Sequence, residues 1–206
     1  MTSPIDIYKT GTPTDRGSLG YYCLLDWWDK EFTKQEQLYI IDKYKPMGGG
    51  ELTTGTILGS SATAINFLTD LQSWFTTLSD EIISEKILKK AESLLTGETP
   101  ILDIHFLYSC SIEHYYKKRN IDFGFYELAN QYCLKQIALG QKAKDAFLSE
   151  PWFPTLPRHK GYEQLAIILE KEKKYDEALK LCYEARDAGW NSDWDKRIST
   201  LQRKMK

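Results

Sequence analysis

The stretch RHKGYEQLAIILEKEKKYDEALKLCYEARDAGW, residues 158–190, decides the fold that this sequence predicts. Its first half carries apolar residues at positions i, i+3, i+4 and i+7, which is the spacing of one face of a helix. A second face of the same kind follows a polar break at residues 170–174. The two faces comprise Tyr162, Leu165, Ala166 and Leu169, and then Tyr175, Ala178, Leu179, Cys182 and Ala185. Two amphipathic helices joined by so short a break must lie antiparallel and bury these faces against each other, with Gly189 ending the second helix.

This helix pair resembles a tetratricopeptide repeat. The first helix of that repeat has an aromatic, a Leu, a small and a large residue, which correspond to Tyr162, Leu165, Ala166 and Leu169, and Ala178, Cys182 and Ala185 match its second helix. The turn and the opening of the second helix match at residues 174–178. Two positions depart from the pattern, because Cys182 stands where Phe or Tyr is usual and Trp190 stands near the closing Pro. The segment is also similar to the ends of bacterial proteins, phage-related ones among them, and that similarity implies no chemistry.

A degenerate copy of the pair precedes it. The first-helix pattern recurs 37 residues earlier as Phe125, Leu128, Ala129 and Tyr132, and Ala143, Ala146 and Phe147 follow as a short partner helix beyond Gly140. A period of this length is typical of helical repeats. The prolines of residues 151–157 forbid helix between the copies, and we expect the aromatic residues there to pack on a neighbouring pair. The sequence predicts a last helix that starts after Asn191–Ser192, and we expect it to be the polar end cap that helical stacks need.

The remaining helices are marked by their caps. Residues 19–30 are rich in aromatic side chains and predict one buried helix, and Thr33 with Glu36 forms a capping box for the next. Further helices are predicted at about residues 61–75 and 79–95, then from an N-cap at Thr99 to Asn120, and after Asp122. No segment alternates as a strand does. We therefore expect an all-α chain of eight or nine helices.

The predicted organisation has three parts. Residues 1–18 form an irregular arm, residues 19–96 form an N-terminal helical bundle, and residues 97–206 form tetratricopeptide-like antiparallel helix pairs with a capping helix.

Composition excludes several classes of protein. The 206 residues are 42% apolar and 27% charged, as in ordinary globular chains. The sequence has neither an apolar run long enough for a membrane span nor a signal-peptide core, so we expect a cytoplasmic protein with no membrane partner. Cysteines at 23, 110, 133 and 182 lack paired spacing and predict reduced thiols. Residues 1–100 carry 9 basic and 14 acidic groups, and residues 101–206 carry 18 and 15, which is too even for a nucleic-acid surface.

The sequence predicts no cofactor or metal site. His105, Cys110, Glu113 and His114 share one helix, but the two histidines are nine residues apart and point in opposite directions. Only His159 remains as a third histidine, and we interpret the first two as edge residues of an amphipathic helix. The glycine-rich segment at residues 48–61 has no Lys after its glycines and no strand before them, so it is interpreted as a flexible linker rather than a phosphate loop.

Binding through the repeats is the predicted function. The resemblance implies a concave groove, lined by the first helix of each pair, that takes an extended peptide or a partner helix. The groove positions correspond to Tyr126, Asn130, Lys160, Glu163, Gln164 and Ile167. Asn130 and Lys160 suit the polar clamp that some repeat proteins use for a terminal carboxylate. Two alternatives stay open: an enzyme with its site on the helix of residues 105–114 or in the N-terminal part, and a structural or phage-related component that assembles with copies of itself.

Overall fold

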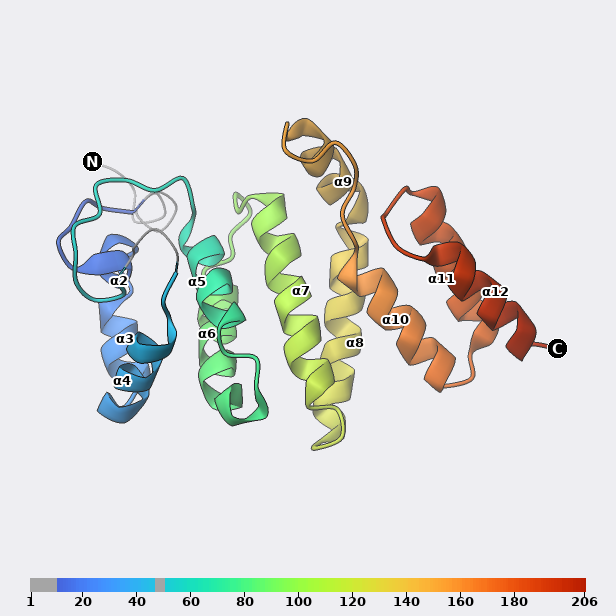
Figure 1. Ribbon diagram of the computed structural model, residues 1–206, viewed down its shortest axis with the longest axis horizontal. Coiled ribbons are helices and arrows are strands. Elements are labelled where there is room, and N and C mark those ends of the chain that lie inside the picture. Colours follow the sequence, from blue (N-terminus) through green and yellow to red (C-terminus); the bar gives the residue numbers. More distant parts are fainter. Residues whose placement is uncertain (1–10, 47–50) are drawn as a thin grey trace. The chain divides into compact units, whose positions relative to one another are not determined.

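The computed structural model describes residues 11–46 and 51–206, and within these ranges the regular elements are all helices (Figure 1). Two isolated β-bridges, between Thr14 and Ile57 and between Arg16 and Gly55, are the extended pairings found there. The chain divides into two compact units, Met1–Thr99 and Pro100–Lys206, which are described separately. No helix in the described ranges is long and apolar enough to cross a membrane.

Unit 1 contains α-helices and one 3-10 helix, η1. They are α2 (Gly17–Tyr21), α3 (Leu25–Glu31), α4 (Lys34–Lys43), α5 (Ala64–Ser73), η1 (Leu78–Asp80) and α6 (Glu81–Ser93). The predicted capping box of α4 is confirmed, because the Thr33 hydroxyl accepts the Glu36 N–H and the Glu36 carboxylate accepts the Thr33 N–H. Thr63 caps α5 with a single side-chain bond, because its hydroxyl accepts the N–H of Asn66.

The single helix predicted over residues 19–30 is instead two helices, α2 and α3. Cys23 separates them with a φ of 57°, in the left-handed region that ends a helix. The many aromatic residues of the segment indicate burial, and Tyr21, Tyr22 and Trp28 are indeed buried. They do not indicate whether the helix is continuous. Of the predicted arm, residues 1–10 lie outside the described residues, and Gly17 already belongs to α2.

The predicted linker is also corrected in its described part. Residues 48–50 lie outside the described residues, but the following segment lies along the start of α2 and accepts hydrogen bonds from it. The N–H groups of Gly17, Ser18 and Leu19 donate to the carbonyls of residues 55, 51 and 52, respectively. Four N–H groups at a helix start have no partner within the helix, and this segment supplies three of them with acceptors.

A buried carboxylate joins the remaining helices of unit 1. Asp80 is fully buried and accepts hydrogen bonds from Lys43 at 2.6 Å and Tyr39 at 2.6 Å, both on α4, and from Thr77 beside η1. Burial alone would raise the pKa of Asp80, but these hydrogen bonds outweigh it and lower the pKa to about 2. The cluster therefore fixes α4 against the start of α6.

Unit 2 consists of α7 (Ile101–Lys117), α8 (Phe123–Ala138), α9 (Gly140–Ser149), α10 (Lys160–Lys171), α11 (Tyr175–Asp187) and α12 (Trp194–Lys204). Pro100, rather than the predicted Thr99, is the residue before α7, and the Thr99 hydroxyl accepts the N–H of Thr96 at 2.9 Å within the preceding turn. The predicted cap of α8 is confirmed, because the Asp122 carboxylate accepts the N–H of Gly124.

The helix pair predicted at residues 158–190 is present as α10 and α11. Ala166 and Ala178 are both fully buried, as close helix approach requires. Gly189 has a φ of 87° and follows α11, and its N–H donates to the carbonyl of Arg186. The N–H of Trp190 donates to the carbonyl of Ala185, which completes the two-bond pattern of a glycine-terminated helix.

The expected pairing of α8 with α9 is not what the structure shows. Instead, α8 packs along α7 and α10, and it meets α9 only where the two helices join. Its start lies near the end of α10, because the Tyr126 hydroxyl donates to Glu172 at 2.6 Å. Its end lies near the start of α10, where Gly161 donates its N–H to Gln136 at 2.6 Å. Only Leu139 separates α8 from α9, and a single residue in a helical conformation cannot reverse the chain direction as an antiparallel pair requires.

Candidate functional site

A hollow of about 400 Å³ opens on unit 2 between α8, α10 and α11. Its apolar lining is made of leucine and isoleucine side chains: Leu134, Leu165, Ile168, Leu169 and Leu181. Leu165 and Ile168 are buried, while Leu134 keeps 53% of its surface exposed at the edge of the hollow. An apolar lining with an exposed leucine at its rim is suited to contact with another protein.

Charged side chains of both signs surround the apolar lining. They are Glu172, Lys174, Glu177, Lys180 and Glu184. Glu172 forms an ion pair with Lys174 at 2.8 Å and accepts a hydrogen bond from the Tyr126 hydroxyl. The bonds to Lys174 and Tyr126 lower the pKa of the Glu172 carboxyl, while burial and the bond to Glu172 raise the pKa of the Tyr126 hydroxyl. The rim is therefore polar, nearly balanced in charge and partly fixed in place.

Asn130 is the one uncharged polar residue that lines the hollow. Its Oδ1 atom is buried and has no hydrogen-bond partner among the described residues. An unsatisfied buried acceptor costs about 1–3 kcal/mol, so a bound group that donates a hydrogen bond would gain from satisfying it.

The other predicted site residues lie elsewhere. The Lys160 ammonium is 3.8 Å from the Glu113 carboxylate of α7, and Gln164 is buried with its Nε2 unpartnered among the described residues. Glu163 accepts hydrogen bonds from Arg158 at 2.8 Å and from Ser192 at 2.6 Å. Ile167 is half-buried.

Helix geometry explains why the structure does not bring Asn130 and Lys160 into one pocket. On α10, Lys160 and Lys171 face α7, where they approach Glu113 and the hydroxyl of Tyr116. Residues 165, 168, 169 and 172 line the hollow and are centred roughly 120° around the helix from that face, at 100° per residue. Tyr126 adjoins the hollow only through Glu172.

The three histidines do not behave as edge residues. His105, His114 and His159 are 2%, 7% and 0% exposed. The rings of His105 and His159 lie 5.0 Å apart between centroids, and Trp190 lies 5.9 Å from the first and 4.6 Å from the second. This contact cannot be predicted from the sequence, because it joins the second turn of α7 to the residue that caps α10.

Burial keeps the two adjoining histidines neutral. It lowers the pKa of His105 to about 4 and, with a smaller contribution from His105, the pKa of His159 to about 3. His159 uses its Nδ1 to accept the N–H of Tyr162 at the start of α10. No group of three or more His, Cys, Asp or Glu residues able to hold a metal ion occurs in the part of the chain that the structure describes.

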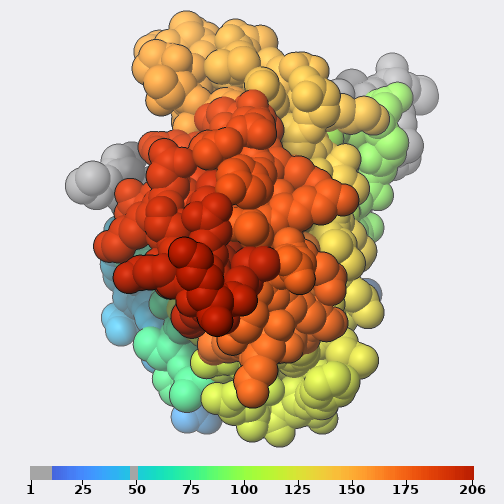
Figure 2. All heavy atoms as spheres, turned by 90° about the vertical axis from the view of Figure 1, so that its right-hand side faces the viewer, coloured from blue at the N-terminus to red at the C-terminus, as the bar shows by residue number. Residues whose placement is uncertain are grey.

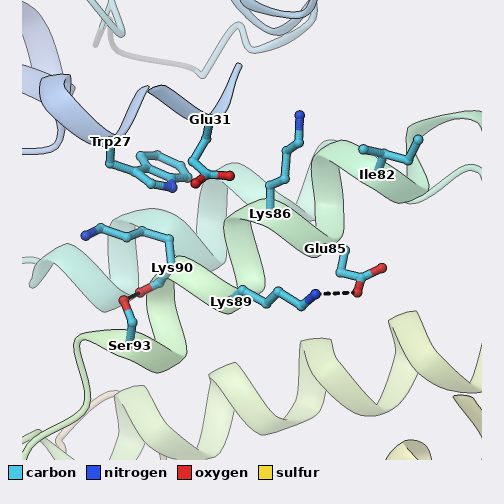
Figure 3. A pocket seen from close by; sticks show the side chains of 8 residues that line it. All are labelled: Trp27, Glu31, Ile82, Glu85, Lys86, Lys89, Lys90 and Ser93. Carbon is cyan, nitrogen blue, oxygen red and sulfur yellow. Dashed lines mark hydrogen bonds and ion pairs between the residues drawn. The ribbon is translucent and has the colours of Figure 1, made fainter. Parts of the chain in front are cut away.

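Unit 1 has a second hollow, of about 500 Å³, between α3 and α6. Figure 3 shows Trp27 and Glu31 extending from α3 toward the side of α6 that carries Lys86, Lys89 and Lys90. Two of these ammonium groups are already paired, Lys86 with Glu36 at 2.8 Å and Lys89 with Glu85 at 2.9 Å. The hollow therefore has little free positive charge with which to hold an anion.

Comparison with models of protein families, with curated proteins and with solved structures found no match to this chain.

Proposed function

We propose that unit 2 is a protein-binding module of tetratricopeptide-like architecture, and that it holds a peptide or a helix of its partner in the hollow between α8, α10 and α11. The observation that carries the proposal is the leucine-lined hollow itself, which is open to solvent, rimmed by charges of both signs and edged by the exposed Leu134. Protein interfaces share this plan of an apolar centre within a polar rim.

The packing of unit 2 supports a repeat architecture in a different register from that of the sequence pattern. The two antiparallel pairs are α7 with α8 and α10 with α11, while α9 is an insertion and α12 packs on α11 as a closing helix. The first helices of the pairs are then α7 and α10. The surfaces of α7 and α10 that face each other are already joined by contacts such as the hydrogen bond from Lys171 to Tyr116. The hollow lies instead on the side of α8 and α11.

The balanced rim favours a protein partner over nucleic acid. Glu177 and Glu184 flank Lys180 on the exposed side of α11, so the phosphate backbone would meet as much repulsion as attraction. A partner side chain of leucine or aromatic type gains from the apolar lining instead, because a few buried side chains of this kind dominate most protein interfaces.

The test compares two exposed leucines. Leu134→Asp places a charge in the hollow, and Leu38→Asp places one on α4 of unit 1, where Leu38 is 70% exposed. Both variants should keep the wild-type melting temperature, because neither side chain is buried. The first should weaken capture of a partner from native-host lysate at least tenfold, about 1.4 kcal/mol, and the second should leave it unchanged. Equal capture by Leu134→Asp and wild type would reject the hollow as the binding surface.

The predicted carboxylate clamp is tested separately by single variants. Asn130→Ala should weaken partner capture, because Asn130 lines the hollow. Lys160→Ala should not, because the Lys160 ammonium is engaged with Glu113 on the face toward α7. Equal losses in the two variants would instead favour a clamp formed by both residues.

A further inference from the structure

An aromatic side chain is displayed to solvent on the turn that follows α9. Trp152 is 81% exposed, although tryptophan is among the side chains that gain most from burial. Figure 2 shows α9 and this turn, in yellow-orange at the top, projecting beyond the later helices of unit 2. Leu148, on the last turn of α9, adds a second apolar side chain with 52% of its surface exposed.

The turn fixes the backbone at Trp152. The N–H of Phe153 donates to the carbonyl of Glu150 at 3.1 Å, which closes a four-residue turn with Pro151 at its second position. Proline at that position fixes the backbone in advance. The ring of Phe153 anchors the turn by packing edge-on against the buried Phe147, 5.0 Å between centroids. Of the aromatic residues expected to pack here, Phe153 therefore does so and Trp152 does not.

An exposed tryptophan on a fixed turn suits binding, because the backbone loses little conformational entropy when the side chain enters a pocket. Trp152 is not part of the hollow of its own chain, whose lining comes from α8, α10, α11 and the turn before α11. The side chain is therefore available to another molecule.

The hollow on unit 2 has the chemistry that an indole requires. Its leucine and isoleucine side chains match the apolar ring, and a volume of about 400 Å³ leaves room for one. An indole also carries one N–H donor, which needs an acceptor when buried. Asn130 lines the hollow and its Oδ1 has no hydrogen-bond partner among the described residues, so rotation about the soft Cβ–Cγ bond is the movement that would present this acceptor to an indole.

We propose that Trp152 of one copy of this chain inserts into the hollow of a second copy, with its indole N–H donating to Asn130. The proposal rests on the proposed function, because it assigns an occupant to the same hollow. Donor and acceptor surfaces differ, so each copy keeps one free Trp152 or one free hollow after a contact forms. Such contacts extend into open chains or close into rings, the smallest of which is a two-fold dimer with two reciprocal contacts.

The assembly should be weak and concentration-dependent. One buried aromatic side chain removes about 150–250 Å² of its surface from water, which is far less than a stable interface buries. Sedimentation velocity of the full chain over a concentration series should therefore show a mass that rises steadily with concentration.

Two variants and their mixture test the contact. Trp152→Ala loses the inserted side chain but keeps the hollow, and Leu134→Asp keeps Trp152 but spoils the hollow. Each variant should remain monomeric at concentrations where wild type assembles, because its self-association constant should be at least tenfold lower. A mixture of the two should form a complex of two chains and no larger species, because one intact contact remains. Trp152→Phe should fall between wild type and Trp152→Ala, since it keeps an aromatic ring without the N–H.

The outcomes separate this inference from the proposed function. Assembly of Trp152→Ala to the same extent as wild type, or a wild-type chain that stays single throughout, would overturn the Trp152 contact. If the wild-type chain stays single while Leu134→Asp still loses partner capture, the proposed function stands without it. Titration with a peptide of residues 150–157 provides the direct probe, and its failure to bind wild type would also overturn the contact.

Discussion

Acidification from pH 7 to pH 5 should destabilise unit 2 through its two adjoining histidines. His105 and His159 are at least 98% buried, and burial lowers their pKa values from the ordinary 6.5 to about 4 and about 3. Between these values and pH 6.5 the unfolded chain takes up protons that the folded chain does not. Stability is therefore fully present above pH 6.5 and falls as the pH drops below it.

The magnitude follows from the proton uptake. Each histidine lowers the free energy of unfolding by about 1.4 kcal/mol per pH unit once the pH is well below 6.5. Over the interval from pH 7 to pH 5 this amounts to about 2 kcal/mol for each histidine and about 4 kcal/mol for both. Carboxyl groups contribute little here, because most of them titrate below pH 5.

Urea unfolding followed by circular dichroism at pH 7 and pH 5 measures the effect. His159→Asn is the matched variant, because asparagine keeps an acceptor for the N–H of Tyr162 but does not titrate. Its loss of stability between the two pH values should be about 2 kcal/mol smaller than that of wild type. The same loss in both proteins would refute the assignment of His159 as a neutral buried group.

Three further predictions concern packing and charge. Gly161→Ala should lower the free energy of unfolding by about 1–3 kcal/mol, because an added Cβ would lie 2.9 Å from the Cys133 carbonyl oxygen. An added Cβ at Gly97 meets no atom within 4 Å, so Gly97→Ala should be nearly neutral, and thermal melts compare the two variants. Ala178→Leu should overpack the contact of α10 with α11 and lower the free energy of unfolding by about 1–3 kcal/mol as well. An unchanged melting temperature would contradict that packing. Unit 1 should lose stability as the pH falls from 3.8 toward 2, because Asp80 has its pKa lowered to about 2; an acid titration of Asp80→Asn should lack this component.

Several helix ends and caps can be predicted from the sequence because they depend on neighbouring residues. The stripes of α10 and α11, the capping box at Thr33 and the terminating Gly189 each involve groups within a few positions of one another. Cys23 escaped prediction for the opposite reason. A non-glycine residue rarely adopts a positive φ, so nothing in the sequence marks it as a helix break.

The pairing of helices was misread because α8 and α10 carry the same apolar spacing. That spacing shows which face of a helix is buried and does not show which helix covers it. The decisive feature was the single residue, Leu139, between α8 and α9, which leaves no room for a chain reversal.

Only part of the candidate site can be predicted from the sequence, because the sequence does not show which helices pack together. Asn130 lies in the hollow as a side chain of α8, but Leu134, Leu169 and Leu181 come together only through the packing of three helices. An exposed leucine on a helix is common, and its sequence position alone does not mark a binding surface.

Photo-crosslinking from position 134 tests the central claim most directly. A photoreactive residue at Leu134 sits at the edge of the hollow, and one at Leu38 provides a surface control in unit 1. In native-host lysate, or with purified chain at high concentration, position 134 should give a discrete protein adduct that position 38 does not. The adduct should weaken at least tenfold when Asn130→Ala is added. Equal labelling from both positions, or an adduct indifferent to Asn130, would contradict a binding role for the hollow.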